Sequence, residues 1–265
     1  MVLLNGQPLS SYEPEDLLLN RSFKYGDGLF ESGRIYQGDW LFEDQHYHRL
    51  LNGMEALSFE FDQTDFRFQL QTWVRKAIES FPAQSHLRIR VQVFRSGAGA
   101  YQPAASGPVC VVEVRPLKGK EVYEALDPVS LVDYTEVLLQ HSPLSGYKTS
   151  NALPYVLAAR HAQLSGADHS VMYCDDYVSE ADSANLFVVR KKQVATPLLE
   201  FACLDGVMRK QVIRMCETLK LSCQEKPLTA ADLRAADEIF LTNSVKGIIP
   251  VRKYEDRELD LKRFG

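Results

Sequence analysis

The stretches LRIRVQVFRS, residues 87–96, and PVCVVEVRP, residues 108–116, decide how the first half of the chain folds. Both are rich in β-branched residues, which favour strands because their side chains pack well on a pleated surface. The segment Gly97-Ala98-Gly99-Ala100 follows the first stretch and suits a loop between strands. We therefore expect a strand pair that ends the first half near Arg115.

Upstream of this pair the pattern predicts strands first and then helices. Residues 2–4 followed by Asn5-Gly6 indicate a strand entering a tight turn, and residues 33–36 and 40–42 indicate a hairpin around residues 37–39. Apolar positions then recur at helical spacing at His46, Leu50, Met54 and Leu57, and again at Phe66, Leu70, Val74 and Ile78. The first half is therefore expected to be an α+β domain, residues 1–115.

Downstream of the pair, residues 116–120 are short, polar and turn-forming, so they are the expected linker to a second domain, residues 121–265. In that domain we expect strands and helices in alternation. The expected strands are 129–134, 170–176, 184–191 and a final one at 238–242, with a turn at 177–180, and the expected helices are 152–166, 207–221 and 229–236.

Composition excludes several classes of protein. Of the 265 residues, 45% are hydrophobic and 25% are charged, which is typical of a globular protein. The net charge of −5 and the lack of a basic tract argue against a nucleic-acid partner. The five cysteines show no metal-ligand spacing and are expected to be reduced, and no apolar run is long enough to span a membrane, so we expect a cytoplasmic protein.

Lys148, in the segment SGYKTSNALP, is the first candidate for chemistry. It is expected in the loop that precedes the helix at 152–166, where Tyr147 and Leu153 allow it to be buried. A lysine becomes a nucleophile only when burial or a nearby cation leaves its amine neutral. Taken alone, it could equally be an ordinary surface charge.

Glu180, in VSEADSANLF, is the second candidate. A carboxylate held near a heteroaromatic nitrogen favours the protonated ring, because an opposite charge within about 4–6 Å stabilises the charged form. The alternative is a turn residue that faces solvent.

The third candidate is a phosphate cradle. Asp205-Gly206-Val207-Met208-Arg209 begins a predicted helix, and Thr242-Asn243-Ser244 follows a predicted strand. The N–H groups at a helix start suit a phosphate, and a hydroxyl from the second segment could complete the contacts. Ordinary caps and turns use the same residues.

Taken together, these segments resemble the class IV, or fold type IV, pyridoxal-phosphate enzymes, which include branched-chain and D-amino-acid aminotransferases and aminodeoxychorismate lyases. The resemblance rests on the order and spacing of motifs along most of the chain. They are FKYGDGLFESGRIY with Arg34 (23–36), the H-x-x-R-L pattern at 46–50, YKTSN (147–151), VSEADSANLF (178–187), LDGVMR (204–209) and FLTNSVKGIIPV (240–251). It implies a two-domain α/β fold with pyridoxal 5'-phosphate between the domains and a homodimer.

The resemblance also implies roles for individual residues. Lys148 would be the Schiff-base lysine and proton shuttle, and Glu180 would face the pyridine nitrogen. Arg49 would bind the phosphate together with the backbone of Val207 and Met208, the Ser244 hydroxyl and the neighbouring Asn243. Many relatives have threonine at the place of Met208, so one side-chain donor is missing here.

Among class IV members, the aminodeoxychorismate lyases are favoured by Lys148-Thr149-Ser150-Asn151, by Thr242-Asn243-Ser244-Val245 and by Ile248-Ile249-Pro250. In such a lyase, Lys148 would remove the ring proton next to the imine carbon, and protonation of the enolpyruvyl group would release pyruvate and leave 4-aminobenzoate, a folate precursor. One alternative is an aminotransferase for branched-chain or D-amino acids. Another is a protein that binds the cofactor without turnover.

The substrate of the lyase carries carboxylates, so cationic side chains should meet it. Arg95 is our choice for this contact, because it adjoins the glycine-rich loop at 97–101 that would cover the cofactor in relatives. Arg88, Arg90 and Lys246 are the other cations considered, and alternating Arg88 and Arg90 are expected to form a solvated strand face.

Overall fold

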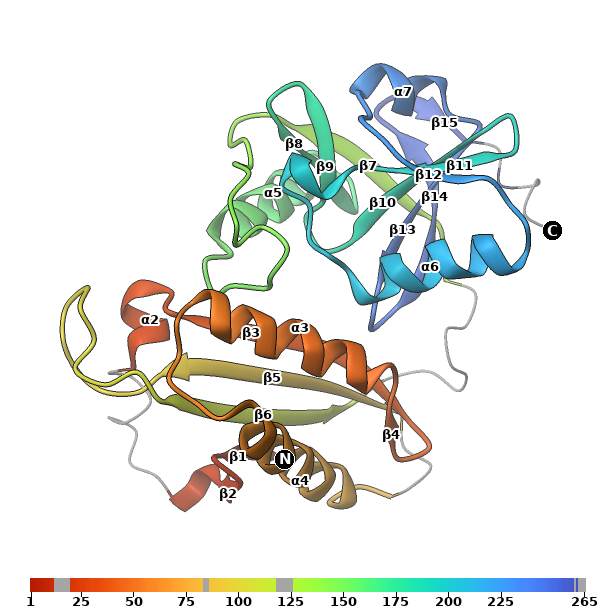
Figure 1. Cartoon of the computed structure of the whole chain (residues 1–265). Helices are drawn as coiled ribbons and strands as arrows, with labels where there is room; N and C mark the ends of the chain where they lie inside the picture. The colour runs from red at the N-terminus through yellow and green to blue at the C-terminus, as the bar shows by residue number, and fades with distance from the viewer. Residues whose placement is uncertain (12–19, 83–85, 118–125, 260, 262–265) are drawn as a thin grey trace. The chain divides into compact units, whose positions relative to one another are not determined.

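The computed structural model describes residues 1–11, 20–82, 86–117, 126–259 and 261 (Figure 1). The chain divides into two units, of which unit 1 is Met1–Val122 with Tyr147–Asn151 and unit 2 is Tyr123–Gly146 with Ala152–Gly265. Residues 118–120 of the expected linker lie outside the described residues. Lys148, which the sequence analysis assigns to the second domain, belongs to unit 1, because a β-bridge joins Thr149 to Leu29.

Unit 1 contains a six-stranded antiparallel sheet in the order β2-β1-β6-β5-β3-β4. The strand pair expected after residue 86 is confirmed as β5 and β6. The turn at Asn5-Gly6 is also confirmed, because both residues have positive φ angles, 45° and 78°. The strands are β1 (Val2–Leu4), β2 (Gln7–Pro8), β3 (Gly28–Tyr36), β4 (Asp39–Trp40), β5 (Leu87–Arg95) and β6 (Pro108–Pro116).

Two long helices cover one face of this sheet, as Figure 1 shows. They are α3 (Glu43–Ala56) and α4 (Gln63–Glu79), and both were expected from their apolar spacing. Their buried side chains form one core with alternate residues of β3, β5 and β6, such as Ile89, Val91 and Val112. Two short helices, η1 (Leu9–Ser11) and α2 (Arg21–Tyr25), were not expected.

Unit 2 contains a nine-stranded mixed sheet in the order β12-β11-β10-β13-β14-β7-β8-β9, with β15 paired to β14. The pairs β11–β12, β14–β7 and β7–β8 are parallel and the others are antiparallel. The strands are β7 (Val129–Tyr134), β8 (His169–Cys174), β9 (Tyr177–Ala181), β10 (Asn185–Arg190), β11 (Gln193–Thr196), β12 (Cys223–Glu225), β13 (Glu238–Asn243), β14 (Gly247–Tyr254) and β15 (Arg257–Glu258).

The three expected helices of the second half are confirmed within unit 2. They are α5 (Leu153–Leu164), α6 (Val207–Thr218) and α7 (Ala230–Ala235), and a 3-10 turn η2 (Leu199–Phe201) was not expected. Helix α7 begins with a capping box in which Thr229 and Asp232 satisfy each other's backbone N–H groups. Helix α6 begins after Gly206 with no side-chain cap.

Two strand predictions in this half were wrong. Residues 177–180 are not the turn between paired strands, because they form most of β9, which pairs with β8, while β10 pairs with β11 and β13. The strand at 238–242 is not the last one, because β14 follows it and pairs with it. Polar residues hid the strand pattern in both places, namely Ser179 and Glu180 in β9 and Lys253 in β14. Tertiary packing outweighs this local pattern.

The helices in the described residues include none that is both long and apolar enough to cross a membrane.

Candidate active site

Lys148 lies in a loop that is held along β3 within unit 1. The Phe30 N–H donates to the Lys148 carbonyl at 2.8 Å, and the Ser150 N–H donates to the Gly28 carbonyl at 2.8 Å. The Lys148 amine lies 4.7 Å from the centre of the Phe30 ring. The residue is half-buried, so the loop presents the amine against an aromatic face rather than on an exposed helix.

Arg49 is part of a buried charged cluster on α3 and β3. Its Nε and Nη2 donate to the two oxygens of Glu31, at 2.7 and 2.6 Å, and His46 Nδ1 lies 2.7 Å from Glu31 Oε2. None of the three residues is more than 6% exposed. The cluster therefore fixes the guanidinium in a bidentate ion pair, which is the strongest geometry for this kind of contact.

Burial and charge act in opposite directions on this cluster. Burial would raise the pKa of Glu31, but the Arg49 guanidinium and hydrogen bonds from His46 and Arg49 lower that pKa to about 2. Burial lowers the pKa of His46 even though Glu31 raises it. At neutral pH the cluster is thus a carboxylate, a guanidinium and a neutral imidazole that donates through Nδ1.

We expect Glu31→Gln to remove part of the acid sensitivity of the fold. Because the pKa of Glu31 in the folded state lies below its ordinary 4.5, the carboxylate stabilises the protein at neutral pH. That contribution, about 3 kcal/mol, disappears as the pH falls from about 4.5 through about 2. Urea unfolding at roughly pH 7 and pH 3 should show a smaller pH dependence in the variant.

The exposed Glu79 at the end of α4 offers a matched control. Glu79→Gln should keep the acid sensitivity of the original protein. An equal pH dependence in all three proteins would contradict the ionised state assigned to Glu31.

Glu180 is buried on β9 of unit 2 rather than facing solvent, with 3% of its surface exposed. Tyr155 of α5 donates its hydroxyl to Oε1 at 2.8 Å, and Asn185 of β10 donates Nδ2 to Oε2 at 3.1 Å. Burial is the largest cause that raises the pKa of the Tyr155 phenol, and the nearby Glu180 carboxylate raises it further. The phenol therefore keeps its proton. The two donors orient the carboxylate for a further contact.

The start of α6 lies next to this carboxylate. Asn185 also donates Nδ2 to the Leu204 carbonyl at 2.9 Å. A Cβ on Gly206 would lie 1.8 Å from Asn185 Oδ1, so only glycine allows this approach. Because no side chain caps α6, the backbone N–H groups of Val207 and Met208 at its first turn suit an anion.

The segment that follows β13 forms a tight turn. Asn243 Oδ1 accepts from the N–H groups of Val245 and Lys246 at 3.1 and 2.8 Å, and its amide donates to the Ser183 carbonyl at 3.4 Å. Asn243 therefore holds the turn, and Ser244 is half-buried within it.

Arg95 is used inside unit 1. Its Nε lies 3.1 Å from Asp27 Oδ2, and its two terminal nitrogens donate to the carbonyls of Ser58 and Leu57 at 3.0 and 2.5 Å. Its guanidinium also lies 4.5 Å from the centre of the Phe59 ring. These contacts favour a structural role over the substrate contact expected from the sequence.

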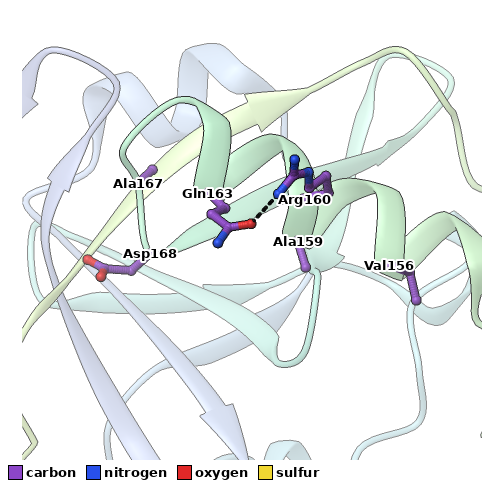
Figure 2. A pocket seen from close by; sticks show the side chains of 6 residues that line it. All are labelled: Val156, Ala159, Arg160, Gln163, Ala167 and Asp168. Atoms are coloured by element: carbon purple, nitrogen blue, oxygen red, sulfur yellow. Dashed lines mark hydrogen bonds between the residues drawn. The ribbon is translucent and has the colours of Figure 1, made fainter.

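An open hollow of about 520 Å³ runs along the outer side of α5. Figure 2 shows the side chains that line it, with Arg160 donating to Gln163 at 2.7 Å. None of the expected site residues lines this hollow, so it is not the predicted site. Its lining residues are Val156, Ala159, Arg160, Gln163, Ala167 and Asp168.

Comparison with known proteins assigns the family. The model of the amino-transferase class IV family matches residues 28–254. The chain belongs to this family. The resemblance drawn from the sequence motifs and the fold type expected from it are thereby confirmed.

Class IV relatives with different activities match nearly the whole chain. An aminodeoxychorismate lyase of Vibrio harveyi is 30% identical over 257 residues, which cover 95% of this chain and 90% of the relative. A D-alanine aminotransferase of Bacillus licheniformis is 25% identical over 262 residues, which cover 97% of this chain and 89% of the relative. The comparisons therefore show the class IV family and leave its lyase and aminotransferase branches open.

Solved class IV structures share the fold. The 4-amino-4-deoxychorismate lyase of Pseudomonas aeruginosa has a TM-score of 0.81 at 25% identity, covering 98% of this chain and 94% of that one. The branched-chain amino acid aminotransferase of Escherichia coli has a TM-score of 0.87 at 21% identity, covering 100% and 89%. An aminotransferase of Brucella abortus, solved with the cofactor PLP, has a TM-score of 0.80 at 21% identity, covering 92% and 86%.

Sequence reasoning missed the residues that hold the class IV motif residues in place. Tyr155 and Asn185 contact Glu180, Glu31 contacts Arg49, and His46 in turn contacts Glu31. Glu31, His46 and Asn185 lie inside the quoted motifs, so their proximity to a motif residue was a usable signal. Tyr155 gave none, because its contact with Glu180 depends on how α5 packs.

Proposed function

We propose that this chain is a PLP-dependent aminodeoxychorismate lyase, which releases pyruvate and forms 4-aminobenzoate. The observation that carries the proposal is the 30% identity to a lyase over nearly the full length of both chains. The segments around Lys148 and Ser244 support it, since both are closer to the lyases than to the aminotransferases.

The donor chemistry of the described residues fits pyridoxal 5'-phosphate. A half-buried lysine amine suits the aldehyde carbon, and a buried carboxylate with two fixed donors suits a protonated ring nitrogen. An uncapped helix start suits the phosphate. We propose that Lys148 and Arg49 of unit 1 and Glu180, Val207, Met208, Ser244 and Asn243 of unit 2 bind the same cofactor.

When bound, the cofactor would supply an aldehyde for the substrate amine and a protonated ring that withdraws electrons from the carbon bearing that amine. Lys148 Nζ would then act as a general base that takes the proton from the ring carbon bearing the nitrogen, while the enolpyruvyl oxygen leaves the adjacent ring carbon, and would return a proton to the methylene carbon of the released enolpyruvate. Pyruvate thereby leaves and the ring becomes aromatic. Glu180 keeps the proton on the pyridine nitrogen throughout.

The phosphate contacts position the reacting groups. Glu31 holds the Arg49 guanidinium and is itself held by His46, which limits the motion of the phosphate that Arg49 would bind. Val207 and Met208 contribute backbone N–H groups, and Asn243 holds the turn that carries Ser244. Met208 adds no hydroxyl, so the helix backbone takes a larger share of the binding.

Pyruvate release from enzymatically generated aminodeoxychorismate tests the proposal. We expect stoichiometric formation of pyruvate and 4-aminobenzoate, at a rate proportional to the concentration of PLP-loaded protein. Absence of both products with fully loaded protein would contradict the lyase assignment.

An aminotransferase is the second candidate, favoured by the D-alanine aminotransferase relative that covers 97% of this chain. In single-turnover mixing with L- or D-amino acids, an aminotransferase converts the cofactor to its pyridoxamine form, whereas a dedicated lyase leaves the absorbance largely unchanged. No reaction with any amine would favour a protein that binds PLP without turnover.

We propose a homodimer as the assembly, as implied by the class IV resemblance. The native mass of the loaded protein tests this, and a mass of one chain contradicts it.

A further inference from the structure

Asn185 is the first residue of β10, and its side chain contacts two other segments of unit 2. Its Nδ2 donates to Glu180 Oε2 on β9 at 3.1 Å and to the Leu204 carbonyl ahead of α6 at 2.9 Å. Only 4% of Asn185 is exposed, so both contacts are made away from water. One amide therefore connects the carboxylate proposed for the ring nitrogen to the segment that leads into the helix start proposed for the phosphate.

The start of α6 is fitted closely around this amide. Gly206, the residue before α6, has φ of −68° and ψ of 135°, which any residue can adopt. Glycine is needed there for space, because an added Cβ would lie 1.8 Å from Asn185 Oδ1. The Lys210 N–H donates to the Gly206 carbonyl at 3.0 Å, so Gly206 opens the helix. A displaced Asn185 side chain would thus disturb the first turn of α6 as well as Glu180.

The sheet holds the backbone of Asn185 in place. Asn185 lies directly opposite Thr242 in the pairing of β10 with β13, and the next pair on the same face is Phe187 with Phe240. These two rings stack with their centres 4.9 Å apart and pack with Val212 of α6. Asn185 therefore lies on the face that α6 covers, where backbone pairing fixes the point from which its side chain extends.

An amide suits this position better than other small polar groups. Its two N–H groups point in different directions, so one nitrogen can hold a carboxylate and a carbonyl at the same time. A carboxylate in its place would donate nothing and would repel Glu180, and a hydroxyl could donate to only one acceptor. Tyr155, the other donor to Glu180, has a single hydroxyl proton and uses it on that carboxylate.

We propose that Asn185 is a positioning residue that couples the two ends of the cofactor site. It holds the Glu180 carboxylate and the start of α6 in one arrangement, so that the contact at the ring nitrogen and the contact at the phosphate strengthen each other. This inference rests on the proposed placement of PLP against Glu180 and α6. It does not depend on whether the chain is a lyase or an aminotransferase.

Comparison of PLP with pyridoxal, which lacks the phosphate, measures the phosphate contact without turnover. We expect the full chain, freed of its cofactor, to bind PLP at least about 100-fold more tightly than pyridoxal, because several N–H groups meet charged oxygens. Asn185→Ala should lower this ratio about tenfold, whereas Tyr155→Phe should leave it within about twofold. The reason for the difference is that the Tyr155 hydroxyl contacts Glu180 rather than α6.

A substitution at the phosphate end should also be felt at the ring end. Gly206→Ala forces the Asn185 side chain away from the new methyl group and so disturbs Glu180. The ring nitrogen should then lose its proton at a pH about one unit lower, as followed by the absorbance of the bound cofactor. Asn185→Ala should cause a similar shift, and because it removes the clash, adding Gly206→Ala to it should cause no further shift. A substitution that only weakens folding would add its effect in either background.

Two further variants separate this coupling from a loss of folding. Gln193→Ala removes an exposed amide from β11, the strand paired with β10, and should change neither the ratio nor the titration. Should Asn185→Ala fail to fold, Asn185→Ser, which keeps one donor, takes its place in both measurements. An unchanged ratio of PLP to pyridoxal affinity in the Asn185 variant, or additive effects of the Asn185 and Gly206 substitutions, would overturn the proposal.

Failure of this inference can be told apart from failure of the lyase assignment. Neither the binding ratio nor the titration needs turnover, so a protein that shows both expected effects but releases no pyruvate keeps the coupling and loses the lyase assignment. A protein that releases pyruvate but binds pyridoxal as tightly as PLP keeps the lyase assignment and loses the coupling.

Discussion

Lys148→Ala is expected to lower turnover by at least about 10³-fold, the largest effect of any single substitution in this chain. The structure supplies the reason, because the loop at 147–151 is bound along β3 and sets one amine against the Phe30 ring. If Lys148 both holds the cofactor and transfers the proton, its removal takes away two functions at once. We also expect the absorbance that arises from cofactor attached to lysine to disappear.

The measurement combines pyruvate release with a visible spectrum of protein reconstituted with PLP. Lys148→Arg keeps a positive charge near Phe30 but cannot form the covalent link, so it should be as inactive as the alanine variant. Lys226→Ala, at an exposed position of unit 2, is the matched control and should keep both activity and spectrum. A lysine-linked spectrum that persists in Lys148→Ala would remove this residue from its proposed role.

Glu180→Gln should produce the second-largest loss, at least about 100-fold in turnover, with the cofactor still covalently attached. A neutral amide cannot favour a protonated pyridine nitrogen as a carboxylate does. The structure adds a second consequence. If the amide oxygen accepts from Tyr155, the amide nitrogen faces the Asn185 donor, which the Leu204 carbonyl holds in place.

These two donors facing each other should lower the free energy of unfolding by about 1–3 kcal/mol, because one buried donor is left without an acceptor. Thermal unfolding with and without PLP measures this part, and the pH dependence of the cofactor absorbance measures the loss of the ring proton. Glu200→Gln, at an exposed site of unit 2, should change neither. Wild-type turnover in Glu180→Gln would show that no carboxylate is needed at the ring nitrogen.

Much of the fold could be predicted from local pattern. The helices α3 to α7 and the strands β5, β6 and β7 follow from apolar spacing, β-branched composition and capping residues, which act between near neighbours in the chain. The strand β9 could not be predicted in this way. Its sequence, Tyr177–Ala181, contains Ser179 and Glu180, yet both are buried because β8 and the elements around it enclose them.

The same distinction between local pattern and tertiary packing applies to the candidate site. The sequence by itself determined the family and the order of the chemically special residues, since Lys148, Glu180, Arg49 and the start of α6 lie in motifs whose spacing is recognisable without a structure. Only the tertiary structure decided what each side chain touches. It showed that the Arg95 guanidinium is bound by Asp27 and by backbone carbonyls, whereas the Arg90 guanidinium lies on an aromatic ring beside a neutral amide. Contacts of this kind join elements that are far apart in the chain, and burial sets their strength, so the order of residues does not encode them locally.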